Sequence, residues 1–190
     1  MSEHLHQNKV FEKVTYSHKE IKNREFESCT FQQCELSESN FIGCRFIDCT
    51  FTSCNLTMLK LQRCTMSNAL FRDSKVLGVN FSTCEESLFS VRFEGCIADY
   101  ASFMNKKMAK TIFRQTSLKQ VNFANAVLTQ AVFDGCDLSE ALFNRTQLNE
   151  ADFRTARNYI IDPENNPIRK AKFSTYGLPG LLIKYNLHIE

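Results

Sequence analysis

The sequence predicts an all-β fold in which the chain winds as a four-sided coil around an apolar axis. Over most of its 190 residues an apolar side chain recurs at every fifth position, and 15 of the 17 phenylalanines stand at such positions. A small residue stands two places before nearly every one of them. A period of five fits neither a helix, with about 3.6 residues per turn, nor a strand, with about two, whereas a fixed short period is typical of solenoids.

The period is interrupted once, near residue 86. Glu86 stands where an apolar residue is due, and an unpaired carboxylate cannot lie in an apolar core. The period resumes two residues late, so we expect an outward bulge at 84–87. The apolar positions are Phe11, Tyr16, Ile21, Phe26, Phe31, Leu36, Phe41, Phe46, Phe51, Leu56, Leu61, Met66, Phe71, Val76 and Phe81 before the bulge, and Leu88, Phe93, Ala98, Phe103, Met108, Phe113, Leu118, Phe123, Leu128, Phe133, Leu138, Phe143, Leu148 and Phe153 after it.

If each five-residue unit forms one side of the coil, a full turn takes ~20 residues and successive turns stack ~4.8 Å apart. The apolar residue and the small residue two places before it then point to the axis, and the other three face solvent. After the bulge, phenylalanines alternate with smaller apolar residues, which places the rings on two opposite walls. Large side chains then meet small ones in each layer, as close packing requires.

The nine cysteines share one place in this pattern, the small inward position. We expect them to act as small apolar residues and to stay reduced, because stacked parallel Cβ atoms ~4.8 Å apart exceed the ~3.8 Å of a disulfide. No C-x-x-C pair occurs, and thiols that point into an apolar core are poor zinc ligands. We therefore expect no metal site. The residues are Cys29, Cys34, Cys44, Cys49, Cys54, Cys64, Cys84, Cys96 and Cys136.

The pattern divides the chain into three segments. Residues 1–10 are polar and are expected to precede the coil as a loose end, with His4 and His6 lacking the third ligand of a metal site. Residues 11–157 form the repeat coil. Residues 158–190 abandon the period, and they are expected to contain a short helix at about Pro179–Tyr185 and an alternating strand at 187–190.

The last segment is the predicted cap and the predicted dimer interface. A solenoid leaves the edge of its last turn open, so something must cover it. An apolar helix with an unpaired strand can also pair with a second copy across a two-fold axis. The residues assigned to this interface are Leu178, Leu181, Leu182, Tyr185, Leu187 and Ile189.

Composition excludes several classes of function. The formal net charge is only +2, with 23 Lys and Arg against 21 Asp and Glu mixed along the chain, so there is no basic stripe for nucleic acid and no strong acidity. No apolar run could span a bilayer and no secretory signal is present, so we expect a cytoplasmic protein. No Walker loop, HExxH or G-x-S-x-G motif occurs, so we expect neither an enzyme nor a bound cofactor.

Several repeat units resemble the consensus A-(D/N)-L-x-x of the pentapeptide-repeat family. The clearest are Ala151-Asp152-Phe153, Val121-Asn122-Phe123 and Cys136-Asp137-Leu138. The resemblance covers Phe11 to about Ala156, and it implies a right-handed quadrilateral β-helix. Members serve many roles, so the repeat alone names no function.

The tail resembles one bacterial branch of that family, which includes the quinolone-resistance (Qnr) proteins and MfpA. This resemblance implies a homodimer formed by the C-terminal helix and strand. It also implies a non-catalytic rod that docks on DNA gyrase or topoisomerase IV and protects it from a toxin or a quinolone-type drug. The alternative is a protein–protein interaction scaffold with no topoisomerase role.

Candidate partner contacts lie around the bulge and on later repeats. Phe89 either anchors a partner from the bulge or packs on a neighbouring turn. The predicted contacts are Glu85, Glu86, Phe89, Asp134, Asp137 and Glu140.

Overall fold

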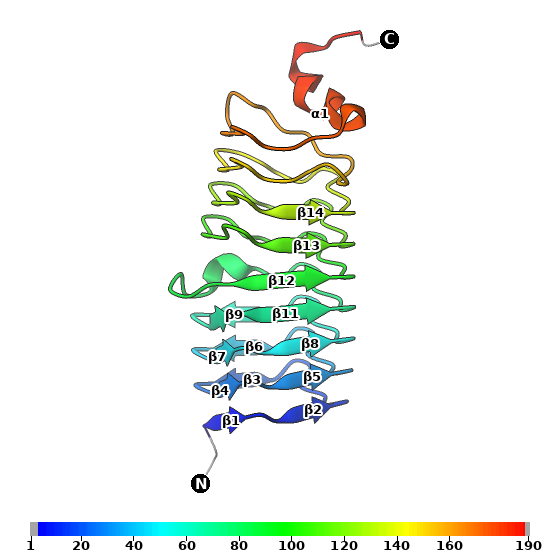
Figure 1. Ribbon diagram of the computed structural model, residues 1–190. Helices are drawn as coiled ribbons and strands as arrows, with labels where there is room; N and C mark the ends of the chain where they lie inside the picture. Colours follow the sequence, from blue (N-terminus) through cyan, green and yellow to red (C-terminus); the bar gives the residue numbers. More distant parts are fainter. Residues whose placement is uncertain (1–3, 189–190) are drawn as a thin grey trace.

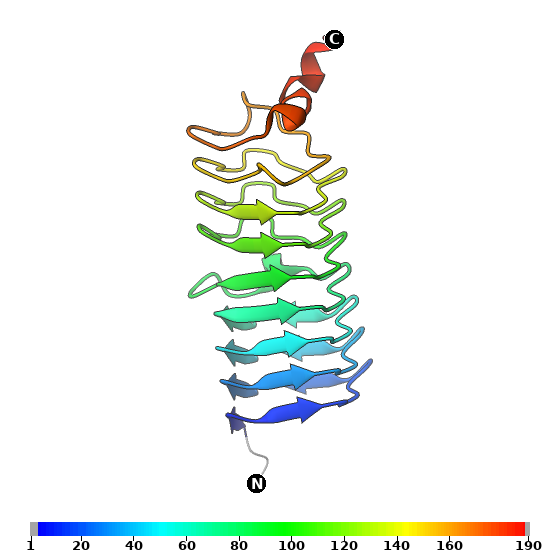
Figure 2. The same ribbon diagram turned by 45° about the vertical axis from the view of Figure 1, so that its right-hand side comes forward.

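The chain forms a rod of stacked coils, with its two termini at opposite ends (Figure 1). The computed structural model describes residues 4–188. Short strands of successive coils pair in parallel into a seven-stranded, a four-stranded and a three-stranded sheet. The seven-stranded sheet follows one side of the rod and comes forward in Figure 2.

Three sides of the rod carry these sheets. The fourth side is held by isolated parallel bridges, such as Glu35 to Asn55 and Asn55 to Lys75. The predicted four-sided all-β coil is therefore confirmed. The strands of the seven-stranded sheet are β2 (Val10–Glu12), β5 (Thr30–Gln32), β8 (Thr50–Thr52), β11 (Ala69–Arg72), β12 (Val91–Glu94), β13 (Ile112–Arg114) and β14 (Val132–Asp134); those of the four-stranded sheet are β1 (Leu5–Gln7), β4 (Glu25–Glu27), β7 (Arg45–Ile47) and β10 (Thr65–Ser67); those of the three-stranded sheet are β3 (Glu20–Lys22), β6 (Asn40–Ile42) and β9 (Lys60–Gln62).

The register between neighbouring strands measures the length of one coil. Phe31 lies opposite Phe51, a separation of 20 residues. Across the bulge Phe71 lies opposite Phe93, a separation of 22, and beyond it Phe93 lies opposite Phe113, again 20. The two-residue shift in the sequence period is therefore confirmed as one longer coil.

Phenyl rings fill the axis of the rod in continuous stacks. On the seven-stranded side, Phe93 and Phe113 stack face to face with centroids 5.3 Å apart. On the opposite wall, Phe103 and Phe123 stack at 5.5 Å. Rings of the two walls meet edge to face, as Phe103 does with Phe113 at 6.0 Å, a favourable aromatic geometry. The predicted placement of the rings on two opposite walls is confirmed.

Most corners of the coil turn through left-handed backbone at residues other than glycine. Lys13, Gln33 and Ser53 occupy equivalent corners, each with φ of 53°. This conformation is costly for residues with a Cβ atom. At each of these corners the amide donates to a carbonyl of the next coil, as Lys13 N does to Gln32 O at 2.9 Å. These inter-coil hydrogen bonds allow a chain of 190 residues with only 6 glycines to turn so often.

The cysteines lie where the pattern placed them, and all nine are buried free thiols. Most of their sulfurs are also hydrogen-bond donors to the preceding coil: Cys49 Sγ donates to Phe26 O and Cys64 Sγ to Phe41 O, both at 3.3 Å. Thr146 Oγ1 makes the same bond to Phe123 O at 2.9 Å. Burial raises the pKa of the Cys49 thiol to about 12, so it remains protonated and unreactive.

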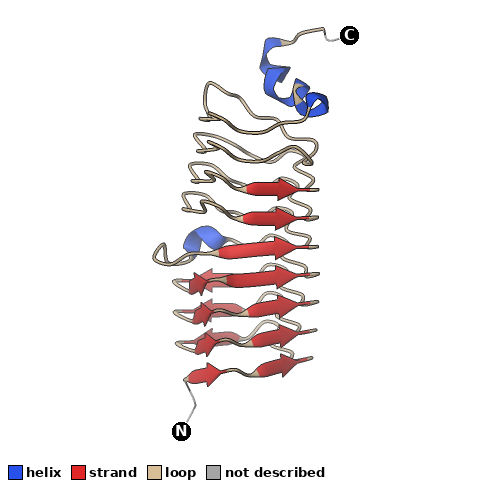
Figure 3. Cartoon of the chain, in the orientation of Figure 1, coloured by secondary structure: helices blue, strands red, loops and turns tan. Residues whose placement is uncertain are grey.

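The coil is longer at both ends than the expected 11–157. At the N-terminal end, β1 lies inside the segment expected to precede the coil, and His6 stacks on Phe26 with centroids 5.1 Å apart. At the C-terminal end, Phe173 stacks on Phe153 at 5.3 Å, and Asp152 bridges to Lys172. These last coils carry no named strands and are drawn as loops in Figure 3.

The cap follows the last coil as a chain of three short helical turns. The helix expected at Pro179–Tyr185 is confirmed as α1 (Pro179–Leu182) followed by a 3-10 turn (Ile183–Tyr185), and a further 3-10 turn (Thr175–Gly177) precedes it. The expected strand at 187–190 is not found: Leu187 and His188 have no regular secondary structure, and the last two residues lie outside the described part of the chain.

Candidate interaction surfaces

The bulge projects from an otherwise regular rod between two backbone hydrogen bonds. Glu85 N donates to Cys64 O at 2.9 Å, where the chain leaves the coil below, and Ser90 N donates to Met66 O at 2.8 Å, where it returns. Four consecutive residues of this segment, Glu85–Leu88, are exposed, and we call them the knob. Leu88 is its last residue, 68% exposed, with φ of 63°.

The two apolar residues of the bulge differ in exposure, and of the two placements left open for Phe89 the structure shows packing on a neighbouring turn. Leu88 was expected to point inward, but it faces solvent. Phe89 instead is 7% exposed and packs edge-on against Phe81 with centroids 6.2 Å apart, so it is not an accessible contact residue. Burying the larger phenyl ring removes more apolar surface from water, which favours this choice.

Two lysines of the following coil contact the bulge. Lys107 forms a surface ion pair with Glu86, with Nζ and Oε1 2.7 Å apart, and this hydrogen bond lowers the pKa of the Glu86 carboxyl. Exposed pairs of this kind contribute little to stability. Lys106 is 4% exposed and its Nζ donates to Cys84 O at 2.6 Å. Lys106 was not among the predicted contact residues, although a lysine at a small inward position departs from the pattern of the sequence.

The other predicted acidic contacts lie on later coils and are not brought together with the knob. Asp134 accepts a hydrogen bond from Thr155 Oγ1 at 2.9 Å, and Glu140 accepts one from Gln120 Nε2 at 3.0 Å. Both carboxylates are thus engaged by neighbouring coils.

Asp137 is tied most closely into the rod. It accepts hydrogen bonds from Ser139 Oγ at 2.7 Å and Asn158 Nδ2 at 2.9 Å. Burial alone would raise its pKa, but these bonds and the nearby Lys119 ammonium hold the pKa at about 2. The carboxylate therefore stabilises adjacent coils and is poorly placed to serve an external partner.

Ion pairs of alternating sign run along the seven-stranded side. Arg72 binds Glu94 with an N–O distance of 2.9 Å, and Arg114 lies 3.5 Å from Asp134. In both pairs a positive side chain is matched by a negative one on the next coil. This side consequently presents no continuous acidic surface of the kind that a double helix has.

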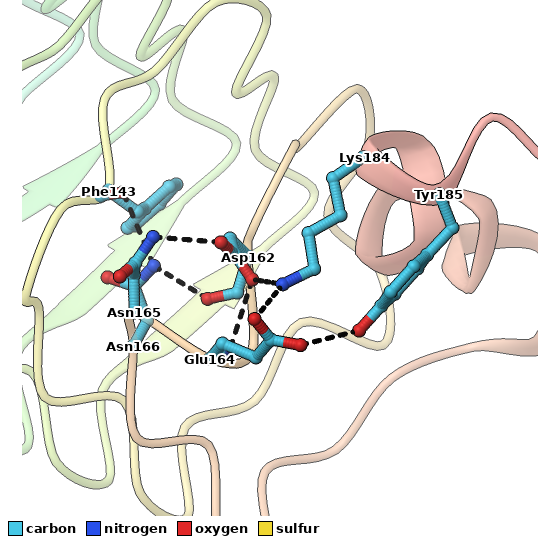
Figure 4. Close-up of polar contacts among 7 residues, drawn as sticks. All are labelled: Phe143, Asp162, Glu164, Asn165, Asn166, Lys184 and Tyr185. Carbon is cyan, nitrogen blue, oxygen red and sulfur yellow. Dashed lines mark hydrogen bonds and ion pairs between the residues drawn. The ribbon is translucent and has the colours of Figure 1, made fainter.

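An ion-pair network fastens the cap to the last coil (Figure 4). Lys184 Nζ lies 2.6 Å from Asp162 Oδ1 and 2.7 Å from Glu164 Oε2, and Tyr185 OH donates to Glu164 Oε1 at 2.8 Å. Below it, Asn166 is fully buried and its amide nitrogen donates to Asp162 O at 2.9 Å. Lys184 and Tyr185 therefore tie the cap to the last coil, and Asn166 orders the segment that they bind.

The residues predicted for the dimer interface divide into two groups. Leu178, Tyr185 and Leu187 are 44%, 50% and 56% exposed, whereas Leu181 and Leu182 are only partly buried and Leu181 packs against the core. Ile189 lies outside the described residues. Three other exposed apolar residues, Tyr176, Ile160 and Ile183, were not among those predicted, and they line an open cleft of about 500 Å³ with Asn158.

Within residues 4–188, no group of three or more His, Cys, Asp or Glu side chains is arranged to hold a metal ion. In the same part of the chain, every helix is too short or too polar to cross a membrane. The clefts on the rod are open to solvent. The arrangement is suited to binding along a surface.

Two models of pentapeptide-repeat sequences match this chain. A family model described as a pentapeptide repeat region matches residues 24–103, and one described as pentapeptide repeats (8 copies) matches residues 122–157. None of the curated proteins matches the chain.

Solved structures with the same kind of fold cover nearly the whole chain at low identity. A trypsin-treated form of QnrB1, a plasmid-mediated fluoroquinolone resistance protein, is 20% identical over 98% of this chain and 97% of its own, with a TM-score of 0.47. HetL, involved in heterocyst differentiation regulation in the cyanobacterium Nostoc sp. strain PCC 7120, is 15% identical over 90% of this chain and 89% of its own, with a TM-score of 0.48. Rfr23 from the cyanobacterium Cyanothece 51142 is 13% identical over 92% of this chain and 90% of its own, with a TM-score of 0.26.

Proposed function

We propose that this chain, which belongs to the pentapeptide-repeat family, is a non-catalytic rod that binds another protein through its knob, and that this protein is a type II topoisomerase. The observation that carries the proposal is the knob itself. It presents an exposed leucine next to two exposed acidic residues, Glu85 and Glu86, on a scaffold that carries ion pairs between coils, such as Arg72 with Glu94. An apolar side chain fixed on a rigid element is a good anchor, because little conformational entropy is lost on binding.

The identity of the partner is proposed from the resemblance of the repeats and the tail described above. DNA gyrase and topoisomerase IV are the two candidates, and protection from a toxin or a quinolone-type drug is the proposed consequence. Because the charges along the rod alternate in sign, we expect recognition by shape and by the knob, with no imitation of DNA charge. An interaction scaffold with another protein partner is the alternative.

A supercoiling assay with purified gyrase, with and without ciprofloxacin, tests the proposal. We expect the native protein to inhibit gyrase or to rescue it from the drug. Replacing Glu85, Glu86 and Leu88 together with alanine should weaken binding to the topoisomerase at least tenfold, with a melting temperature within a few degrees of native, because these side chains are exposed.

The matched control replaces Glu38 and Met58 with alanine, an acidic and an apolar residue that are also exposed but lie away from the knob. This control should bind like the native protein. If the native protein neither binds nor affects gyrase or topoisomerase IV, the topoisomerase proposal fails and the scaffold alternative remains.

We further propose that the exposed face of the cap binds a second copy of the chain. Light scattering should then give the mass of a dimer, and the double substitution Leu178→Glu with Leu187→Glu should give a monomer with an unchanged melting temperature. Val10, at the other end of the rod, is 66% exposed. The control substitution Val10→Glu should therefore leave the dimer intact. A native protein with the mass of a monomer at micromolar concentration would reject the dimer.

A further inference from the structure

Lys106 occupies a position that holds small side chains on the coils around it. The equivalent residues are Cys64 and Cys84 on the preceding coils and Ala126 on the following one. All are buried, and Lys106 is as buried as they are, at 4% exposed. A charged amine in such a place needs a specific partner, because burying an unpaired charge is costly.

That partner is a backbone carbonyl that the bulge has left without its usual donor. In the regular coil this carbonyl accepts an amide hydrogen from the next coil, as Cys64 O does from Glu85 N and Lys106 O from Val127 N, both at 2.9 Å. Within residues 4–188, no backbone amide donates to the carbonyl of Cys84. Lys106 Nζ donates to it instead, at 2.6 Å, so the side chain replaces the missing backbone hydrogen bond.

The same ammonium group reaches the other end of the bulge. Its nitrogen lies 5.0 Å from the centre of the Phe89 ring, a cation–π contact. Phe89 in turn rests on Phe81 in the core. Lys106 thus contacts, from the following coil, the residue before the knob, Cys84, and the residue after it, Phe89.

We propose that Lys106 is a positioning residue that holds the knob in one conformation. The claim rests on the proposed function and extends it, because a knob that is already ordered loses less conformational entropy when it binds its partner. The restraint itself is a property of the free protein, and it can be measured without any partner.

Amide hydrogen exchange of the substitution Lys106→Met tests the claim. Methionine keeps most of the length of the side chain and removes its charge and its donors. We expect the amides of Glu85 and Ser90, which bond to the coil below at the two ends of the knob, to exchange at least tenfold faster. The amides of Thr50 and Asp152, which make inter-coil bonds in distant regular coils, should change less than twofold.

The melting temperature of Lys106→Met should shift by only a few degrees in either direction, because removal of a buried charge opposes the loss of the hydrogen bond. Lys106→Ala gives a second variant that fits the site, since alanine stands at the equivalent position of the following coil. It should loosen the same two amides.

The matched control is Lys107→Met, which removes the same charge from the adjacent residue and breaks its ion pair with Glu86. Its effect on the Glu85 and Ser90 amides should be less than twofold. The proposal is overturned if neither variant of Lys106 accelerates exchange, if exchange rises equally in all coils, or if Lys107→Met does as much. These results are independent of whether a topoisomerase binds, so the two proposals can fail separately.

Discussion

Replacing Phe113 with alanine is expected to lower the free energy of unfolding by about 3–5 kcal/mol, the cost typical of removing a buried ring from a core that cannot close around the cavity. Phe113 is fully buried. Its ring stacks on Phe93 at 5.3 Å and on Phe133 at 5.2 Å, and it meets Phe103 and Phe123 edge to face at 6.0 and 5.9 Å. Four aromatic contacts are lost at once, in a layer supported by backbone hydrogen bonds to the coils on both sides.

Thermal unfolding followed by circular dichroism provides the measurement. For a chain of this size a loss of about 3–5 kcal/mol lowers the melting temperature by about 6–20 °C. Phe113→Leu should recover part of the loss, because it keeps most of the buried volume. Met104→Ala, at a residue of the neighbouring coil that is 37% exposed, should cost less than about 1 kcal/mol. A loss below about 1 kcal/mol for Phe113→Ala would show that the rings are not packed as described.

Replacing Asn166 with leucine is expected to release the last coil and the cap. Asn166 is fully buried and satisfies three backbone groups: its amide oxygen accepts from Thr146 N at 2.9 Å, and its amide nitrogen donates to Phe143 O at 3.3 Å and Asp162 O at 2.9 Å. Leucine has similar volume but no polar atom. Each unsatisfied buried group costs about 1–3 kcal/mol, so we expect a local loss of about 3 kcal/mol or more.

Limited proteolysis and hydrogen exchange at residues 158–188 measure this loss, because local unfolding of a terminal coil need not lower the melting temperature of the whole rod. Asn165→Ala is the matched control, since Asn165 is exposed and its side chain makes one hydrogen bond, to Asp162 Oδ2 at 2.8 Å. It should leave proteolysis unchanged. Equal protection of the cap in Asn166→Leu and native protein would contradict the role assigned to Asn166.

The five-residue period was sufficient to predict the architecture, because it reports directly on contacts between coils. Phe113 meets its neighbours 20 residues away, so the same spacing that makes the pattern visible also creates the core. The shift at Glu86 predicted one longer coil for the same reason. The ends were harder to predict: His6 and Phe173 both continue the period, but their polar neighbours concealed it.

The details of the bulge depend on contacts that no period describes. Leu88 and Phe89 are adjacent apolar residues, and the choice between them is decided by the space beside Phe81. Lys106 is 20 residues beyond Glu86. Its hydrogen bond to the Cys84 carbonyl could not be predicted, because the sequence does not show that this carbonyl lacks a backbone donor. Sequence reasoning therefore located the bulge and left its conformation open.

A rod that repeats every ~4.8 Å along its axis offers many nearly equivalent binding positions, displaced from one another by a single coil. A partner that contacts only the repeated surface can bind at any of these positions. The knob breaks this translational symmetry, since one such interruption lies within residues 4–188. A partner that contacts Leu88 would be held at one position along the axis. The fixed number of coils between the knob and the cap would then set the distance between two partners bound at these two sites.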